Sequence, residues 1–228
     1  MKLYPTITTT AKDHFQKLEE AKRLGLKEVC FFSTAILISE REKFYNALEK
    51  SSIKSIPFVH IRSDAELWEL DLLTQKYHTK AFNCHSQKEF PLTHDLTKYK
   101  ERIFIENTPG YPYDLADIKK FGGICIDFSH LEIIRVYKHK DYSHNLKIIQ
   151  ENKAGCAHIS AIGRFLPYFP AWAHFFGDHY LRNLSEVDYL LKYKEFFPEI
   201  MALELENSLE EQLKIIDYLS SKISTSKT

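Results

Sequence analysis

Short apolar runs alternate with longer amphipathic stretches from one end of the chain to the other. The apolar runs predict eight β-strands, at residues 2–8, 28–34, 54–61, 80–85, 102–107, 123–129, 155–160 and 200–207. The stretches between them, such as AKDHFQKLEEAKRLGL and SLEEQLKIIDYLSSK, show the period of amphipathic helices. Alternation of strands and helices is typical of βα units that build a parallel sheet.

The helical stretches differ in how well they are defined. Ser39, followed three residues later by Glu42, has the spacing of a capping box and predicts a helix start there. The stretch SEVDYLLKYKEFF (185–197) also predicts a helix. The weakest unit is SQKEFPLTHDLTKYK (86–100), because it contains a proline and little helical period.

Eight strands at this spacing predict an α/β fold, a compact (β/α)8 TIM barrel that spans residues 1–228 as one domain. A doubly wound open sheet is the alternative architecture for the same alternation. The last residues, 220–228, read SSKISTSKT and predict a frayed tail.

Composition limits the partners and the cellular compartment that we expect for the protein. The chain has 31 Lys and Arg against 31 Asp and Glu, which argues against nucleic acid as a partner. The N-terminus lacks the pattern of a signal peptide, and no apolar run approaches the ~20 residues of a membrane helix. The four cysteines lie in strand-like stretches without a CxxC pair, so we expect reduced core thiols in a cytoplasmic protein: Cys30, Cys84, Cys125 and Cys156.

Ionisable residues lie near the C-terminal ends of four successive predicted strands. Side chains alternate between the two faces of a strand, so Ile103 and Ile105 share one face while Glu106 lies on the other. The same split places one ionisable group at the end of each inward-facing set: Glu106, Asp127, His158 and Glu204. In a barrel these groups meet at the C-terminal mouth, where barrel enzymes have their active sites.

Three carboxylates and an imidazole buried together are costly unless a cation neutralises them. The sequence therefore predicts that Glu106, Asp127, His158 and Glu204 bind a divalent metal, either Mn²⁺, Co²⁺ or Zn²⁺. Glu206 is in phase with Glu204, which leaves the choice of the eighth-strand ligand open.

Two more histidines, His60 and His85, end the third and fourth strands in the same phase. A single strand-end histidine is usually a solvated or hydrogen-bonded side chain, and a single strand-end glutamate is usually a salt-bridge partner. Ionisable groups at the ends of six consecutive strands favour a shared site over six separate surface roles.

The ordered set Glu106, Asp127-x-x-His130, His158 and Glu204 resembles the xylose-isomerase-like barrel superfamily, which includes sugar isomerases, ketose 3-epimerases and zinc-dependent apurinic endonucleases. Each motif is short, but together they cover the whole chain in order. The resemblance to the isomerases and epimerases implies a metal-dependent reaction on a sugar, polyol or keto acid. In that reaction Glu106 and Glu204 exchange a proton with the substrate.

The same resemblance implies residues that contact the substrate. Arg164 follows His158 by six residues, the spacing at which the epimerases place an arginine over the substrate. His130 is expected to contact the substrate as well, and His60 and Trp172 are further candidates. The partner expected from this reading is a small carbohydrate.

The endonuclease branch places a different interpretation on the chain. It implies additional zinc ligands, for which His60, His85, Asp178 and His179 are the candidates. The branch uses an Asp-x-His motif, whereas Asp178 and His179 are adjacent here. That departure and the absence of net positive charge argue against DNA cleavage. A barrel that binds a metal or ligand without turnover is the third hypothesis.

An aromatic segment, RFLPYFPAWAHFFGDHY (164–180), follows the seventh strand. It could form a lid on which a sugar ring stacks, or an apolar cap or contact between subunits through residues 165–180. The sequence leaves these alternatives open.

Overall fold

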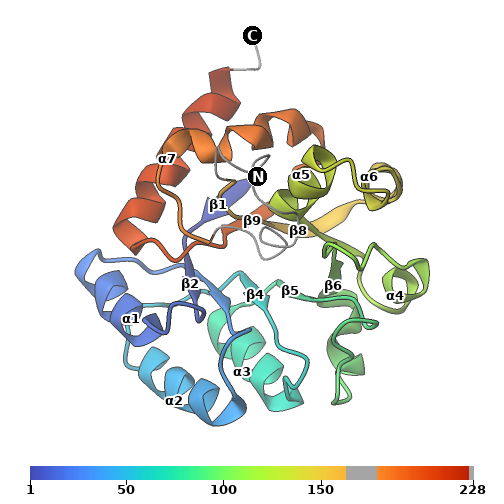
Figure 1. The fold of residues 1–228 in the computed structure, drawn as a ribbon. Helices are drawn as coiled ribbons and strands as arrows, with labels where there is room; N and C mark the ends of the chain where they lie inside the picture. The colour runs from blue at the N-terminus through green and yellow to red at the C-terminus, as the bar shows by residue number, and fades with distance from the viewer. Residues whose placement is uncertain (163–178, 226–228) are drawn as a thin grey trace.

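A computed structural model describes residues 1–162 and 179–225 of the chain. Nine parallel strands form one sheet that curves into a nearly closed barrel, with the helices around it (Figure 1). The strands are β1 (Lys2–Tyr4), β2 (Thr6–Thr8), β3 (Cys30–Phe32), β4 (Phe58–His60), β5 (Ala81–Cys84), β6 (Ile103–Glu106), β7 (Ile124–Asp127), β8 (Ala154–Ile159) and β9 (Ile200–Leu203). This confirms the predicted compact α/β barrel.

The barrel closes through its first strand, which Pro5 divides into β1 and β2. The β1 half pairs with β9, with Leu3 opposite Met201. The β2 half pairs with β3, with Ile7 opposite Phe31. Proline has no N–H to donate to a ladder, so the chain can change neighbours at this point. The single strand predicted at residues 2–8 thus pairs with β9 through its first half and with β3 through its second half.

The side chain of Gln212 completes the closure where β9 does not reach. The backbone N–H of Thr6 donates to Gln212 Oε1 at 2.7 Å, and Gln212 Nε2 lies 3.0 Å from the carbonyl oxygen of Thr6. Nε2 also contacts the carbonyl oxygens of Leu205 and Asn207, at 3.1 and 3.0 Å. The buried amide therefore satisfies backbone groups that a neighbouring strand would otherwise satisfy.

Helices connect most of the strands and cover the outside of the barrel (Figure 1). They are α1 (His14–Arg23), α2 (Ile38–Leu48), α3 (Leu67–Tyr77), α4 (Leu115–Lys120), α5 (Phe128–Val136), α6 (Asp141–Glu151) and α7 (Leu209–Thr225). Among the described residues, two connections contain 3₁₀ segments, η1 (Thr97–Arg102) and η4 (Leu184–Phe196). No helix of the described residues is long and apolar enough to cross a membrane.

The interior of the barrel is filled by the inward-facing residues of the strands. This cluster consists of Tyr4, Cys30, Phe32, Phe58, Ala81, Cys125, Cys156 and Ala202, with Phe104 packed against it. Gly155 allows the close approach of Phe104, because a Cβ at Gly155 would lie 2.1 Å from the ring. The aliphatic residues between them, such as Ile103 and Ile105, pack against the helices. The predicted alternation is therefore correct, and all four cysteines are buried and unpaired.

Four local predictions were wrong. α2 begins at Ile38 after Leu37 and has no side-chain cap, so Ser39 is not its N-cap. The segment 185–197 lies mostly within a 3₁₀ segment that is non-helical at Tyr193, not an α-helix. The C-terminal segment is not frayed from residue 220, because α7 continues to Thr225. The strand predicted at 123–129 ends at Asp127, where α5 begins.

A buried glutamate joins α5 to η4. Glu132 accepts hydrogen bonds from Arg135 at 2.6 Å and from the Tyr193 hydroxyl at 2.7 Å, and it pairs with Lys192. Burial opposes ionisation of Glu132, but these donors hold its pKa below the ordinary value of 4.5. The ionised form is therefore the one that stabilises the fold.

Replacement of Gln212 by Met should lower the free energy of unfolding by about 2 kcal/mol or more, because buried backbone groups of Thr6 lose their partner. Gln150 is exposed on α6, and Gln150→Met serves as the matched control with little expected effect. Urea unfolding of both variants measures the difference. Equal stability of the two variants would show that Gln212 does not support the closure.

The stabilisation from Glu132 should depend on pH. Because the folded-state pKa is lowered, its contribution is complete above the unfolded pKa near 4.5 and is lost as the pH falls below it. At pH 7 the free energy of unfolding of the wild type should exceed that of Glu132→Gln by about 1–2 kcal/mol. The difference is modest because Arg135 and Lys192, the cations that pair with Glu132, are partly exposed and screened by solvent. Urea unfolding measured from pH 7 to pH 3 should show the difference in stability between wild type and Glu132→Gln shrinking as the pH falls. A difference that stays constant over this range would contradict the assignment.

Candidate metal centre

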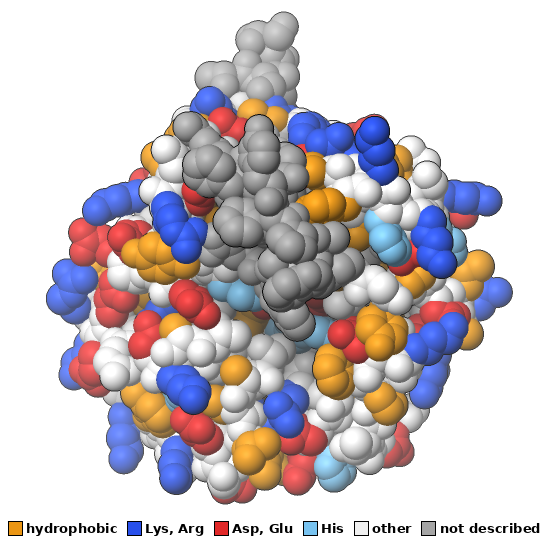
Figure 2. Space-filling model, in the orientation of Figure 1, with side chains coloured by type: hydrophobic (Ala, Val, Ile, Leu, Met, Phe, Trp, Pro, Cys, Tyr) orange, Lys and Arg blue, Asp and Glu red, His pale blue; other side chains and the backbone are white. Residues whose placement is uncertain are grey.

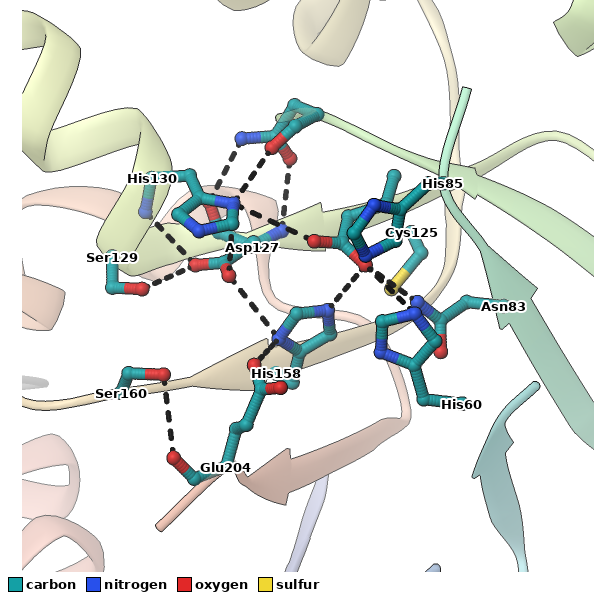
Figure 3. Close-up of polar contacts among 12 residues, drawn as sticks. His60, Asn83, His85, Cys125, Asp127, Ser129, His130, His158, Ser160 and Glu204 are labelled. Carbon is teal, nitrogen blue, oxygen red and sulfur yellow. Dashed lines mark hydrogen bonds and ion pairs between the residues drawn. The ribbon is translucent and has the colours of Figure 1, made fainter. Parts of the chain in front are cut away.

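Four ionisable side chains meet at the mouth of the barrel (Figure 3). Glu106 ends β6, Asp127 ends β7, His158 lies near the end of β8, and Glu204 directly follows β9. All four are buried, and Glu204 is the most exposed at 8%. Parallel strands bring their carboxyl ends to the same rim, so residues separated by about a hundred positions become neighbours.

His158 lies at the centre of this group. Its Nε2 is 3.0 Å from Oε2 of Glu106, and its Nδ1 is 2.9 Å from Oε2 of Glu204 and 3.3 Å from Oδ2 of Asp127. Burial favours the neutral imidazole, but the three carboxylates raise the pKa of His158 well above its ordinary value. Burial likewise opposes ionisation of Glu204, yet His158 and other histidines lower its pKa to about 2.

The potential ligand atoms form three overlapping groups, and in each group they lie within 4.8 Å of one another. The groups are Asp127–His158–Glu204, Glu106–Asp127–His130 and His60–Glu106–His158. No single group contains all four predicted ligands, because the two nitrogens of His158 point to different carboxylates. Glu106 faces Nε2, whereas Asp127 and Glu204 face Nδ1.

Unsatisfied polar atoms show that the centre fits a cation. Asp127 Oδ2 and both ring nitrogens of His158 are buried, and their close contacts with one another and with Glu106, Glu204 and His130 lack the geometry of hydrogen bonds. Such groups are costly unless a ligand binds them. Carboxylate oxygens and imidazole nitrogens are suitable donors for Zn²⁺, Mn²⁺ or Co²⁺. Asp127, His158 and Glu204 together supply this mixed donor set.

Asp127 also forms the N-cap of α5. Its Oδ1 accepts hydrogen bonds from the backbone N–H of His130 at 2.9 Å and from the Ser129 hydroxyl at 2.5 Å. This use of Oδ1 leaves Oδ2 directed toward His158 and His130. The Asp-x-x-His spacing therefore has a local cause, since it is the spacing of an N-cap and the third residue of its helix.

His130 reaches the same cluster from the first turn of α5. Its Nδ1 is 3.1 Å from Asp127 Oδ2, 3.5 Å from Glu106 Oε1 and 3.1 Å from the carbonyl oxygen of Asn107. Burial lowers the pKa of His130, but Asp127 and Glu106 outweigh it and raise the pKa to about 9. His130 is thus a proton donor beside the predicted ligands.

Three residues that support this cluster were not among the site residues predicted from the sequence. Asn83 donates to Glu106 Oε2 at 2.7 Å. Asn107 pairs with the backbone of Asp127, with distances of 2.8 and 2.9 Å, and the Tyr113 hydroxyl lies 3.0 Å from Asn107 Oδ1. The inward phase of Asn83 was the available signal, whereas nothing in the sequence pointed to Tyr113.

The remaining histidines contribute unequally. His60 Nε2 lies 3.6 Å from Glu106 Oε2, and burial lowers the pKa of His60 to about 3, which leaves it neutral. His85 lies beside His60, with ring centroids 5.1 Å apart, but its Nδ1 pairs with Glu89 at 3.0 Å. His179 Nδ1 approaches the carbonyl oxygen of Glu204, not its carboxylate. Only His60 of these three belongs to a potential ligand group.

The geometry also favours Glu204 over Glu206 as the ligand that follows β9. The carboxylate of Glu204 points to His158, whereas Glu206 is only half-buried, and its carbonyl oxygen accepts from Lys17 at 3.1 Å. Arg164, Trp172 and Asp178, with most of the aromatic segment, lie outside the described residues. Their predicted roles therefore stay predictions.

Comparisons with known proteins do not assign the chain to a family. No family model matches the chain, and no curated protein matches it. Among solved structures, a crystal structure of the IolI protein with a bound zinc atom aligns with 12% identity and a TM-score of 0.30. The alignment covers 98% of this chain and 76% of the other. A likeness at this level supports no statement about function.

Two substitutions should separate the two roles of Asp127. Asn retains a good N-cap but removes the carboxylate, whereas Ala removes both. We expect both variants to lose bound metal. Without metal, only Asp127→Ala should lose about 1 kcal/mol of stability from the missing cap. Elemental analysis and urea unfolding measure the two effects. Wild-type metal stoichiometry in Asp127→Ala would show that Asp127 is not a ligand.

Proposed function

We propose that the protein is a divalent-metal-dependent isomerase or epimerase of a sugar or a related polyol or keto acid. The observation that supports this most directly is the pair of buried glutamates, Glu106 and Glu204, on either side of the His158 imidazole. A reaction that removes a proton from one face of a carbon and returns a proton to the opposite face uses two such groups near one substrate.

Asp127, His158 and Glu204 would hold the metal, with Glu106 at the adjoining group. When bound, the metal would polarise a carbonyl and a neighbouring hydroxyl oxygen and make the C–H bond between them more acidic. These donors are buried and come from separate strands, so their positions depend on the barrel and not on a flexible loop.

The two glutamates are suited to proton exchange. Glu106 is held by Asn83, and although burial opposes its ionisation, the surrounding histidines keep its pKa well below the ordinary value. Glu204 is also ionised at neutral pH. One carboxylate would accept the proton from carbon, and the other, ionised in the free protein, would first take up a proton from solvent and then deliver it to the opposite face of the carbon. His130, whose pKa is raised, would donate to a substrate oxygen that gains negative charge.

The group His60–Glu106–His158 favours a second candidate function, a metal-dependent hydrolase or phosphodiesterase with more than one ion. Metal stoichiometry separates the candidates, since one ion per chain supports the isomerase and two or three support the hydrolase. An occupied site with no turnover of any sugar would support the third hypothesis, a barrel that binds a metal or ligand only.

Glu106→Gln and Glu204→Gln should each lower kcat by about 10²–10⁴, because each removes one of the two proton carriers. Glu206→Gln is the matched control and should retain activity, since its side chain is half-buried outside the ligand groups. A panel of ketoses and keto acids, incubated with metal-loaded enzyme in D₂O, reports deuterium at the reacting carbon by NMR. Turnover without deuterium incorporation would argue against the two-carboxylate scheme.

A further inference from the structure

A cavity of about 150 Å³ adjoins the metal centre at the ends of β3, β4 and β5. Its lining combines polar and aromatic side chains, among them Thr34, His60, Arg62, Ser63, His85 and Phe90. His60 belongs to both places, since its Nε2 lies 3.6 Å from Glu106 Oε2. Figure 2 shows a hollow in the middle of this face with histidine side chains inside it. A molecule in the cavity would therefore extend toward the metal centre.

Arg62 is the cation of this cavity, and its guanidinium has capacity for another partner. Nη1 donates to the carbonyl oxygen of Thr34 at 3.2 Å. Nε lies 3.1 Å from Asp64 Oδ1, but it is buried without a hydrogen bond of good geometry among the described residues. Arginine has five N–H donors in a planar fork, which suits the two oxygens of a carboxylate or a phosphate.

An ionic network anchored at the buried Arg41 and Glu69 reaches Arg62 through the partly exposed Asp64. Asp64, which pairs with Arg62, also accepts from Arg41 at 3.0 Å, and Arg41 in turn is bound by Glu69 at 2.8 Å. Arg41 is fully buried, and its charge is matched by Asp64 and Glu69. Of these four charged side chains, Arg62 is the one that lines the cavity. The network therefore presents a single oriented guanidinium to a ligand.

The segments that follow β4 and β5 form the other walls of the cavity. The backbone N–H of Thr93 donates to the carbonyl oxygen of Ser63 at 2.9 Å, which joins the segments after β4 and β5. Phe90 is 51% exposed, and its ring centroid lies 5.3 Å from that of His85. An exposed aromatic ring beside polar groups is suited to the apolar face of a sugar-like carbon chain.

We propose that this cavity binds an oxyanion at the far end of the substrate, so that the substrate is an acidic sugar derivative. The oxyanion is a carboxylate or a phosphate held by Arg62, while the reacting carbons lie at the metal centre. This inference depends on the proposed function for the reacting end. The separation follows from charge, because three carboxylates already lie at the centre, whereas the guanidinium of Arg62 lines the cavity. A further anion is more stable beside Arg62.

Arg62→Met tests the proposal, because it removes the charge and retains most of the side-chain stem. Arg23→Met is the matched control, since Arg23 is an exposed arginine of α1 that pairs with Glu210. The probes are D-glycerate, glycerol 3-phosphate and glycerol, titrated calorimetrically into metal-loaded protein. Wild type and Arg23→Met should bind at least one of the two anions and not glycerol. Arg62→Met should bind that anion about tenfold to hundredfold more weakly.

The preferred probe distinguishes the two sources of the oxyanion, since D-glycerate reports a carboxylate and glycerol 3-phosphate a phosphate. Equal affinity of wild type and Arg62→Met for the anions would overturn the proposal, as would the absence of anion binding to wild type. Metal content and urea unfolding of Arg62→Met exclude loss of the fold as the cause. If the proposed metal centre itself is wrong, this appears in a different measurement, because Asp127→Ala would then retain the metal content of the wild type.

Discussion

The mouth of the barrel is organised by one electrostatic constraint, the burial of three carboxylates around the imidazole of His158. Without water, these carboxylates repel one another and need positive charge or hydrogen-bond donors nearby. The protein supplies part of this through Asn83, Ser129 and the backbone of α5. Asp127 Oδ2 and both ring nitrogens of His158 are among the buried atoms of the described residues that lack a hydrogen bond, and they face one another at the strand ends. This imbalance is the physical argument for a cation.

The rest of the fold supports that cluster. The interior below the mouth is filled by apolar side chains, so the ionisable groups are confined to one end of the barrel. Closure through the divided first strand, completed by Gln212, brings β9 and Glu204 next to β8. Asn107 and Tyr113 fix the backbone at Asp127. A site formed from four separate strands depends on all of these contacts, because each ligand reaches the centre only if its strand has the correct position.

Much of this could be predicted from local pattern. Alternation along each strand correctly assigned Glu106 and Asp127 to the inward face, because the two faces of a strand follow a period of two residues. The helix predicted at 185–197 was wrong, because the segment folds mostly as 3₁₀ turns that are interrupted at Tyr193. The strand at 123–129 was drawn too long because Phe128 and Ser129 continue its apolar character, while the N-cap at Asp127 ends the strand.

The sequence by itself therefore determined the order of elements, the inward phase of the strands and the residue types at their ends, because these depend on neighbours close in the chain. Tertiary structure alone decided that His158 directs its two nitrogens to different carboxylates and that His60 joins the cluster while His85 pairs with Glu89. It alone placed Arg62 beside the candidate metal centre and paired it with Asp64, which also binds Arg41. Side-chain direction and ion pairing depend on contacts between residues far apart in the chain, and no local pattern contains that information.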